Sequence, residues 1–241
     1  LVYGQSSYIQ TLDLAYHPTE RGPYNIYAEN FDSEGKLTNP ATKWGGVMRK
    51  LETTDFETNN IEYLEFWVMD PFVYNDGTMT GGDLYFNLGD ISEDVLKDGR
   101  KFYENGLPVD LDESAVVNTA WGKVPTKQSV VYAFDATEAA RKAQDTGLNG
   151  LSTEQEFNHE SYKTFVEKLS ARLPADARER MLQDKFSPLN DPAGDNFHHY
   201  RGTDYDNAEV GVLERYRYYN GTEGNSQTTS ENEAYTTASS N

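Results

Sequence analysis

The chain of 241 residues carries 21 basic and 40 acidic side chains, which gives a formal net charge of −19 at pH 7. A field of this sign repels phosphate backbones and anionic headgroups, and so argues against binding to nucleic acids or lipid surfaces. Because the sequence contains no cysteine, disulfides, thiol catalysis and thiolate metal sites are excluded.

The first half of the chain reads as strands joined by polar turns. Apolar side chains alternate over residues 8–16, and residues 61–69 carry apolar side chains on both faces. Shorter strands are predicted at residues 83–89 and 129–134, with residues 45–49 as a further candidate.

Aromatic-rich strands separated by Gly, Asp and Asn loops are typical of antiparallel sheets packed face to face. The sequence therefore predicts a β-rich α+β fold, namely a jelly-roll-like antiparallel β-sandwich with a helical insertion. We assign the sandwich to residues 1–134, with strands from residues 186–219 available to complete it, and the insertion to residues 135–185. From Phe186 onward the chain has too little apolar surface to order itself, and we expect a linker or a loop that its neighbours order. Residues 220–241 are predicted to be a disordered polar tail.

Capping signals and a helical period mark the predicted insertion. Residues 135–138 resemble a capping box at the start of a helix that Gly147 ends. A second helix is predicted over residues 153–173, and a proline then begins a further helix over residues 175–183. The apolar stripe of the second helix comprises Tyr162, Phe165, Val166 and Leu169. Capping residues also predict a short helix at residues 92–99.

No apolar run approaches the ~20 residues that a membrane-spanning helix needs. The first residues, Leu1-Val2-Tyr3-Gly4, also lack the charged and apolar regions of a signal peptide. We therefore interpret the chain as a soluble segment from the interior of a longer protein.

The candidate catalytic groups are neighbouring carboxylates and a histidine pair. Asp110, Asp112 and Glu113 could act as general acid and base, or as metal ligands, only if burial separated their proton affinities. His198 and His199 are adjacent, and adjacent side chains on a strand point to opposite faces and do not readily chelate one ion. The sequence has neither a Gly-x-Ser-x-Gly elbow nor a Gly-x-x-x-x-Gly-Lys loop. We therefore expect a protein that is not an enzyme.

Two oxygen-rich turns are candidate calcium-binding sites, because hard cations bind carboxylate and carbonyl oxygens. The candidate ligands are Asp191, Asp195, Asp204 and Asp206. Neither turn has the ligand spacing of an EF-hand loop. The alternative is that these side chains bond the backbone of their own turns. No other cofactor is expected.

Exposed tryptophans would favour a carbohydrate-binding jelly-roll module, which is the alternative function. Trp44 and Trp121 each precede a glycine and are candidates for exposed rings that stack on sugars. Trp67 lies within an apolar strand and is predicted to be a core residue.

A series of short phrases, taken in chain order, carries a family resemblance. The first is Pro-x-Glu-Arg-Gly-Pro-Tyr-Asn at residues 18–25. The later phrases lie at residues 44–49, 54–57, 60–72, 82–94, 98–101, 121–126, 144–151, 200–206, 213–216 and 220–226. Together they resemble the SprA/Sov family, the outer-membrane translocon of the type IX secretion system of Bacteroidetes. The resemblance is least over residues 154–185.

The resemblance implies a very large outer-membrane β-barrel that passes folded cargo proteins. The barrel supports gliding motility in some species and works with a PorV-like shuttle protein and a plug. A lipid-facing barrel strand needs ~10 residues of apolar and polar alternation, and this chain has few such runs. The resemblance therefore implies a soluble domain between barrel strands, with the extracellular side favoured over the periplasm. Its role would be to cap, line or gate the pore, or to dock partner subunits.

The phrases also nominate positions that are characteristic of the family. These are Arg21, Gly22, Pro23, Trp44, Gly45, Asp55, Trp67, Asp70, Gly82 and Arg201. We expect most of them to be structural, because Gly and Pro supply turns and Trp supplies packing.

Overall fold

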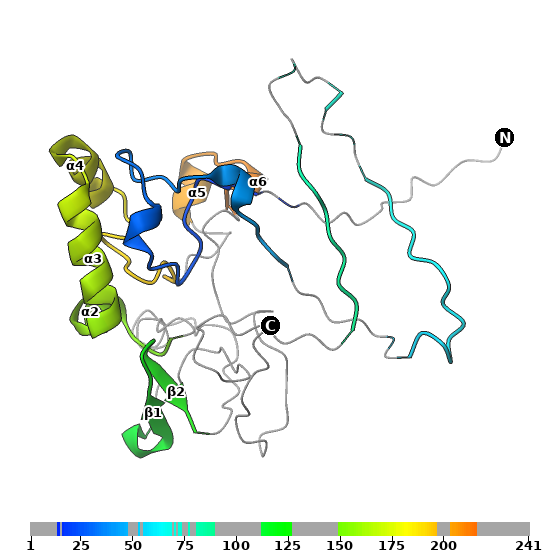
Figure 1. Ribbon diagram of the computed structural model, residues 1–241, viewed down its shortest axis with the longest axis horizontal. Helices are drawn as coiled ribbons and strands as arrows, with labels where there is room; N and C mark the ends of the chain where they lie inside the picture. Colours follow the sequence, from blue (N-terminus) through cyan, green and yellow to red (C-terminus); the bar gives the residue numbers. More distant parts are fainter. Residues whose placement is uncertain are drawn as a thin grey trace. The chain divides into compact units, whose positions relative to one another are not determined.

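The chain divides into two compact units. Unit 1 comprises Leu1–Gly45 with Ser92–Asn241, and unit 2 comprises Gly46–Ile91. The computed structural model describes residues 14, 16–47, 53, 55–68, 70, 72–73, 77, 81–89, 112–126, 149–196 and 203–215. Within these residues, helices belong to unit 1, and unit 2 consists of turns and extended chain (Figure 1).

Three consecutive helices form the most regular part of unit 1. They are α2 (Thr153–Asn158), α3 (Glu160–Arg172) and α4 (Ala175–Gln183). A capping box begins α2: the Ser152 side chain accepts from the Gln155 amide, and the Gln155 side chain accepts from the Ser152 amide. Pro174 separates α3 from α4. The helix predicted over residues 175–183 is therefore confirmed. The stretch predicted as one helix over residues 153–173 is helical but forms two helices, because His159 adopts an extended conformation between them.

The apolar stripe of α3 organises the core of unit 1. Tyr162, Phe165 and Leu169 are almost fully buried. The main core cluster comprises Ala28, Phe31, Leu37, Phe165, Leu169, Leu173, Ala177 and Leu189. The N-terminal part of the chain thus packs on α3 through the 3₁₀ helix η1 (Ala28–Asn30) and the bridge between Phe31 and Leu37.

The remaining elements are short. They are the 3₁₀ helices η2 (Pro40–Thr42) and η3 (Glu113–Ala115), the strands β1 (Val116–Asn118) and β2 (Lys123–Pro125), and the helices α5 (Thr203–Asn207) and α6 (Val212–Arg215). β1 and β2 pair antiparallel, with Val117 opposite Val124.

The predicted jelly-roll sandwich is wrong. In the described part of the chain the only sheet is the β1–β2 pair, and helices and irregular chain make up the rest. An alternating pattern favours extended backbone, but a sheet also needs partner strands, which the pattern does not specify. Residues 61–68 and 81–88 illustrate this: both carry strand-like sequences, yet no ladder joins their described residues.

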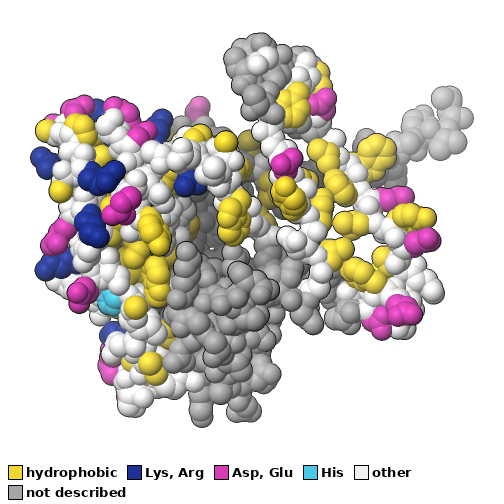
Figure 2. Space-filling model, viewed as in Figure 1, with side chains coloured by type: hydrophobic (Ala, Val, Ile, Leu, Met, Phe, Trp, Pro, Cys, Tyr) yellow, Lys and Arg dark blue, Asp and Glu magenta, His cyan; other side chains and the backbone are white. Residues whose placement is uncertain are grey.

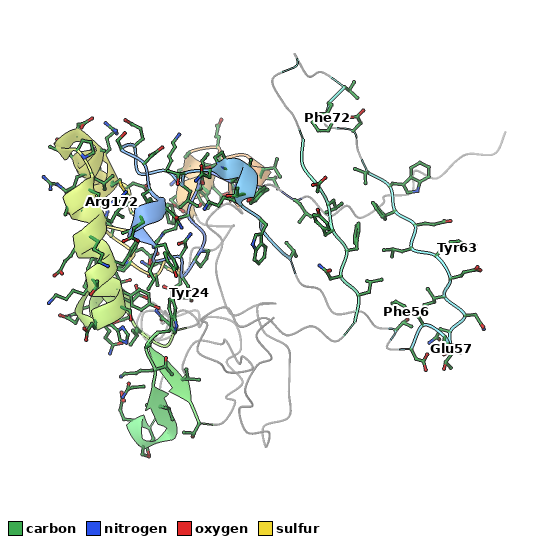
Figure 3. All side chains as sticks on the ribbon, viewed as in Figure 1. Tyr24, Phe56, Glu57, Tyr63, Phe72 and Arg172 are labelled. Carbon is green, nitrogen blue, oxygen red and sulfur yellow. The ribbon has the colours of Figure 1, made fainter. Side chains whose placement is uncertain are left out.

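Unit 2 leaves many apolar side chains uncovered (Figures 2 and 3). The rings of Phe66 and Phe86 touch, with centroids 4.8 Å apart. Other large side chains of the two extended segments are more than half exposed, including Tyr63, Leu64, Val68, Leu84, Tyr85 and Leu88. Trp67 is fully exposed at 103%, so its predicted place in a core is wrong.

The segment after α4 is ordered by its neighbours, one of the two alternatives that the sequence left open. Residues 186–196 have little apolar surface of their own, yet Ser187, Leu189 and Ala193 are buried. Polar bonds fix this segment: the Ser187 hydroxyl donates to the Met181 carbonyl, and the Asn190 side chain donates to three carbonyls at the end of α4. Where residues 186–219 are described, they form turns and short helices, not strands.

Several predicted elements lie outside the described residues. These are most of the strand at residues 8–16, the strand at residues 129–134, the helices at residues 92–99 and 135–147, and the tail at residues 220–241. The assignment of residue ranges to domains stays a prediction. None of the helices in the described ranges has the length and apolar character needed to cross a membrane.

Candidate functional site

A buried group of acids lies at the meeting point of three segments of unit 1. Glu156 comes from α2, and Asp191 and Asp195 come from the turn of residues 191–196. One carboxylate oxygen from each lies within 4.8 Å of the others. Their side chains are 0%, 2% and 4% exposed, in that order. We call these three residues the carboxyl cluster.

The Asp191 side chain holds the 191–196 turn together through hydrogen bonds to its backbone. Its Oδ1 accepts from the amides of Gly194 and Asp195 at 2.8 and 3.3 Å, and its Oδ2 accepts from the Asn196 amide at 3.1 Å. Aspartate favours such turns because its short side chain bonds backbone groups a few residues ahead. Gly194 adopts a φ of +74°, a conformation that glycine reaches without steric cost.

The N-terminal segment closes over this turn through Arg21 and Tyr24. Arg21 donates from Nη1 to the Pro192 carbonyl at 2.5 Å and from Nη2 to the Asp191 carbonyl at 2.8 Å. The Tyr24 hydroxyl donates to Asp195 Oδ2 at 2.8 Å, and the Tyr24 amide donates to the Ala193 carbonyl at 2.6 Å. We call these contacts the clasp. Tyr24 is labelled in Figure 3, and it belongs to the same buried cluster as Tyr162.

Asn149 and Tyr162 complete the network. Asn149 Nδ2 donates to Glu156 Oε1 at 3.0 Å and to the Tyr162 hydroxyl at 3.1 Å. The Tyr162 hydroxyl in turn donates to the Trp121 carbonyl at 2.8 Å. This chain of bonds ties α3 and the turn before α2 to the β1–β2 hairpin.

Burial dominates the electrostatics of the network. Burial raises the pKa of Glu156 to about 7, against the opposing hydrogen bonds from Asn149 and from the Ala193 amide. Burial also lowers the pKa of Arg21, although nearby carboxylates oppose this shift, and it raises the pKa of Tyr162. Each group is therefore displaced towards its neutral form.

The cluster has the donor chemistry of a cation site, since calcium binds carboxylate oxygens. Those oxygens already accept hydrogen bonds from protein groups. Both oxygens of Glu156 accept protein hydrogen bonds, and so do both oxygens of Asp191. The Arg21 guanidinium supplies positive charge next to them. The contacts match a structural polar network, and they also match the prediction that turn aspartates bond their own backbone.

The predicted calcium ligands separate into two groups. Asp191 and Asp195 meet in the carboxyl cluster, whereas Asp204 and Asp206 lie in α5. Asp204 is 3.6 Å from the Lys185 ammonium, and Asp206 is 2.8 Å from the Arg215 guanidinium.

The carboxylates considered as catalytic candidates have structural contacts where they are described. Asp112 accepts from the Ser114 amide and caps η3. Glu113 forms a salt bridge with Lys123 at 3.1 Å. Asp110 and the pair His198 and His199 lie outside the described residues.

The family positions in unit 1 differ in their contacts. Arg21 is the central residue of the clasp, and Pro23 approaches Gly194. Trp44 is 77% exposed, and Gly45 lies close to the Tyr16 ring. Gly22 is exposed and has open space around it, and Arg201 lies outside the described residues.

The family positions in unit 2 are on its surface. Asp55 accepts from the Thr58 amide and hydroxyl, and these bonds lower the pKa of its carboxyl. Asp70 accepts from the Phe72 amide. Nothing lies within 4 Å of a Cβ added at Gly82, and Trp67 is fully exposed.

Sequence reasoning missed Glu156, Asn149, Tyr24 and the polar role of Tyr162. An acid in the first turn of a helix usually faces water and interacts with the helix dipole, so its position suggested exposure. The Asn149-Gly150 turn was the available signal, because Asn favours turns with side-chain bonds to nearby backbone; Asn149 Oδ1 does accept from the Leu151 amide.

Residues 164–241 match the family described as motility related/secretion protein, SprA_N. This match supports membership of the SprA family. The matched region includes Asp191 and Asp195 of the carboxyl cluster and most of α3, whereas Arg21 and Glu156 precede it. Comparison with curated proteins and with solved structures found no match. The match indicates a motility- or secretion-related protein.

Proposed function

We propose that the chain is a non-enzymatic domain of the outer-membrane translocon of the type IX secretion system. In this role it forms part of the cap, the periplasmic portion or a partner-docking surface of the export pore. The family match over residues 164–241 carries the proposal. The phrases that resemble SprA/Sov extend the likeness to the N-terminal part of the chain.

The contacts within unit 1 support treating these stretches as one folded element. Arg21, from the first family phrase, bonds the Asp191 and Pro192 carbonyls inside the matched region, 170 and 171 positions away in sequence. A domain that keeps its shape while cargo passes needs such long-range ties.

The state of the buried acids supports a role without catalysis. A general acid or base must reach a proton of the substrate. The carboxyl groups of Glu156, Asp191 and Asp195 are buried, and their bonding partners are protein groups. The partners proposed for the domain are the rest of the barrel, a PorV-like shuttle, a plug and the secreted cargo.

Deletion of residues 1–241 from the parent protein tests the proposal. Secretion of type IX cargo should fall, while an immunoblot of the outer membrane shows the remaining barrel at its usual level. The control is the parent protein with an epitope tag at the deletion site. Undiminished secretion with a normal level of the deleted protein would rule out the proposed role.

A further inference from the structure

The two extended segments of unit 2 leave their backbone groups unpaired. They comprise residues 61–68 and 81–88, and Figure 1 draws both as open chain. Among the described residues, no backbone hydrogen bond involves residues 62–68 or 81–88. A row of free N–H and C=O groups is a template on which a further strand can pair. Both segments therefore have the backbone chemistry of a sheet edge.

Large apolar side chains along both segments are open to solvent. Phe66 and Phe86 touch, with ring centroids 4.8 Å apart, and each is still more than half exposed. Trp67 is fully exposed, and Tyr63 and Tyr85 are largely exposed. An exposed apolar surface with polar residues around it is typical of a site that binds another protein.

The charge of unit 2 indicates the kind of partner. Residues 51–91 contain nine acidic residues and no lysine, arginine or histidine. Glu62, Glu65 and Asp83 are exposed within or next to the apolar stretches. Figure 2 shows magenta and yellow side chains together on the described part of unit 2. A surface of one sign attracts the opposite charge and repels its own. This disfavours a second copy of the chain and an anionic membrane as occupants.

The exposed rings favour the same kind of partner. Glu65 is two positions after Tyr63 and two before Trp67, so the extended backbone places these three side chains on one face. Arginine stacks on aromatic rings and also forms paired hydrogen bonds with carboxylates. A basic side chain that reaches this face meets a carboxylate between two rings.

We propose that unit 2 is a strand-docking surface. Residues 61–68 and 81–88 bind an extended segment of another polypeptide in which basic side chains alternate with apolar ones. The backbone of the bound segment pairs with the free N–H and C=O groups, and its basic side chains meet the acids and rings. This inference rests on the partner-docking role proposed above and locates that role in unit 2.

Fluorescence anisotropy with the full chain tests the proposal. The probe is a fluorescein-labelled peptide in which Arg and Val alternate, with the length of residues 61–68. A generic sequence suffices, because main-chain hydrogen bonds supply the affinity in strand addition. We expect saturable binding with a Kd below about 1 mM.

Two control peptides test the two parts of the recognition. In the first, Glu replaces every Arg, which reverses the charge. In the second, Pro replaces the central Val residues, which removes backbone donors and keeps the charge. Each should bind at least about tenfold more weakly than the Arg and Val peptide.

Substitutions in the chain separate this surface from general attraction by negative charge. Glu65→Lys should weaken binding of the Arg and Val peptide by about three- to tenfold, and Trp67→Ala by about threefold or more. Both side chains are exposed, so neither change should disturb the fold. The matched controls are Glu167→Lys, at an exposed position of α3, and Trp44→Ala, at an exposed tryptophan of unit 1. Both controls should bind the peptide as the wild type does.

Three results would overturn the proposal. The first is no saturable binding of the Arg and Val peptide to the wild type. The second is equal binding by the two unit 2 variants and their controls. The third is a different occupant: sedimentation that shows a dimer, or flotation with phosphatidylcholine vesicles, that Trp67→Ala abolishes while peptide binding persists.

Failure of this inference is distinguishable from failure of the translocon role. If the peptide does not bind but deletion of the chain lowers secretion, the docking surface alone is rejected. If deletion leaves secretion undiminished, the translocon role is rejected.

Discussion

Gly194 has a position that few other residues could occupy. Its φ is +74°, and an added Cβ would lie 2.7 Å from Arg21 Nη2. Gly194→Ala should therefore lower the free energy of unfolding by about 1–3 kcal/mol, measured by urea denaturation. Gly22→Ala is the matched control, since nothing lies within 4 Å of its added Cβ, and it should change stability by less than about 0.5 kcal/mol. Equal losses in both proteins would contradict the clasp geometry.

Glu156 gives the stability of the protein a definite dependence on pH. Its folded-state pKa of about 7 lies above the ordinary value of 4.5. A raised pKa contributes stability that is fully present below the ordinary value and is lost as pH rises through the folded value. The free energy of unfolding should therefore fall between about pH 4.5 and about pH 7, by at most about 3 kcal/mol.

Urea denaturation across this pH range measures the effect. The slope should be much flatter in the Glu156→Gln protein and unchanged in the Glu154→Gln protein, which loses an exposed acid of the same helix. A wild-type slope equal to that of the Glu156→Gln protein would show that Glu156 is ionised in the folded state.

At the residue scale the sequence identified part of the site. The turn around Asp191 and Asp195 was recognisable because oxygen-rich residues cluster there within a few positions. Arg21 was identified by its family phrase, without a role. The burial of Glu156 could not be predicted, because it depends on Asn149 and Ala193, which approach only when the chain folds.

Among the helices, α3 carries the main core. Leu169 is fully buried in the cluster that joins α3 to η1, so Leu169→Ala should destabilise the protein by about 2–5 kcal/mol. Leu182, in α4, is 55% exposed, and its change to Ala should cost less than about 1 kcal/mol. Thermal unfolding of the two variants compares the same chemical change in two environments. Comparable losses would contradict the described packing of α3.

In the extended segments of unit 2, loss of an aromatic side chain should change the stability very little. Trp67 is fully exposed, so Trp67→Ala should leave the stability within about 0.5 kcal/mol of the wild type. Trp121 packs partly buried against the second core cluster, and Trp121→Ala should cost about 2 kcal/mol. Urea denaturation followed by circular dichroism measures both. A large loss for Trp67→Ala alone would restore the sequence-based interpretation of residues 61–69 as a core strand.

The sequence predicts the helices of this chain better than its strands, and the reason is physical. The capping box at Ser152 and the apolar stripe of α3 are local signals, because helix hydrogen bonds join residues four apart. Strand pairing joins distant residues, and the alternation over residues 61–69 does not name its partner. The order of residues 186–196 was harder to predict for a related reason. Hydrogen bonds to α4 and to Arg21 order this segment, and they do so without a large apolar surface.

At the scale of the whole molecule, we propose that this chain works within a secretion translocon. The clasp brings the first family phrase against the region that matches the SprA family, which makes the two stretches parts of one unit. With a formal charge of −19, the surface repels anionic lipid, and this favours protein partners.

Affinity purification from outer membranes tests this claim most directly. The parent protein would carry a tag inserted near Gln227, and the bound proteins would be identified by mass spectrometry. We expect recovery of a barrel-sized chain together with a PorV-like partner and secretion cargo. Recovery of the tagged protein without these partners, from membranes that contain them, would rule out a role in the translocon.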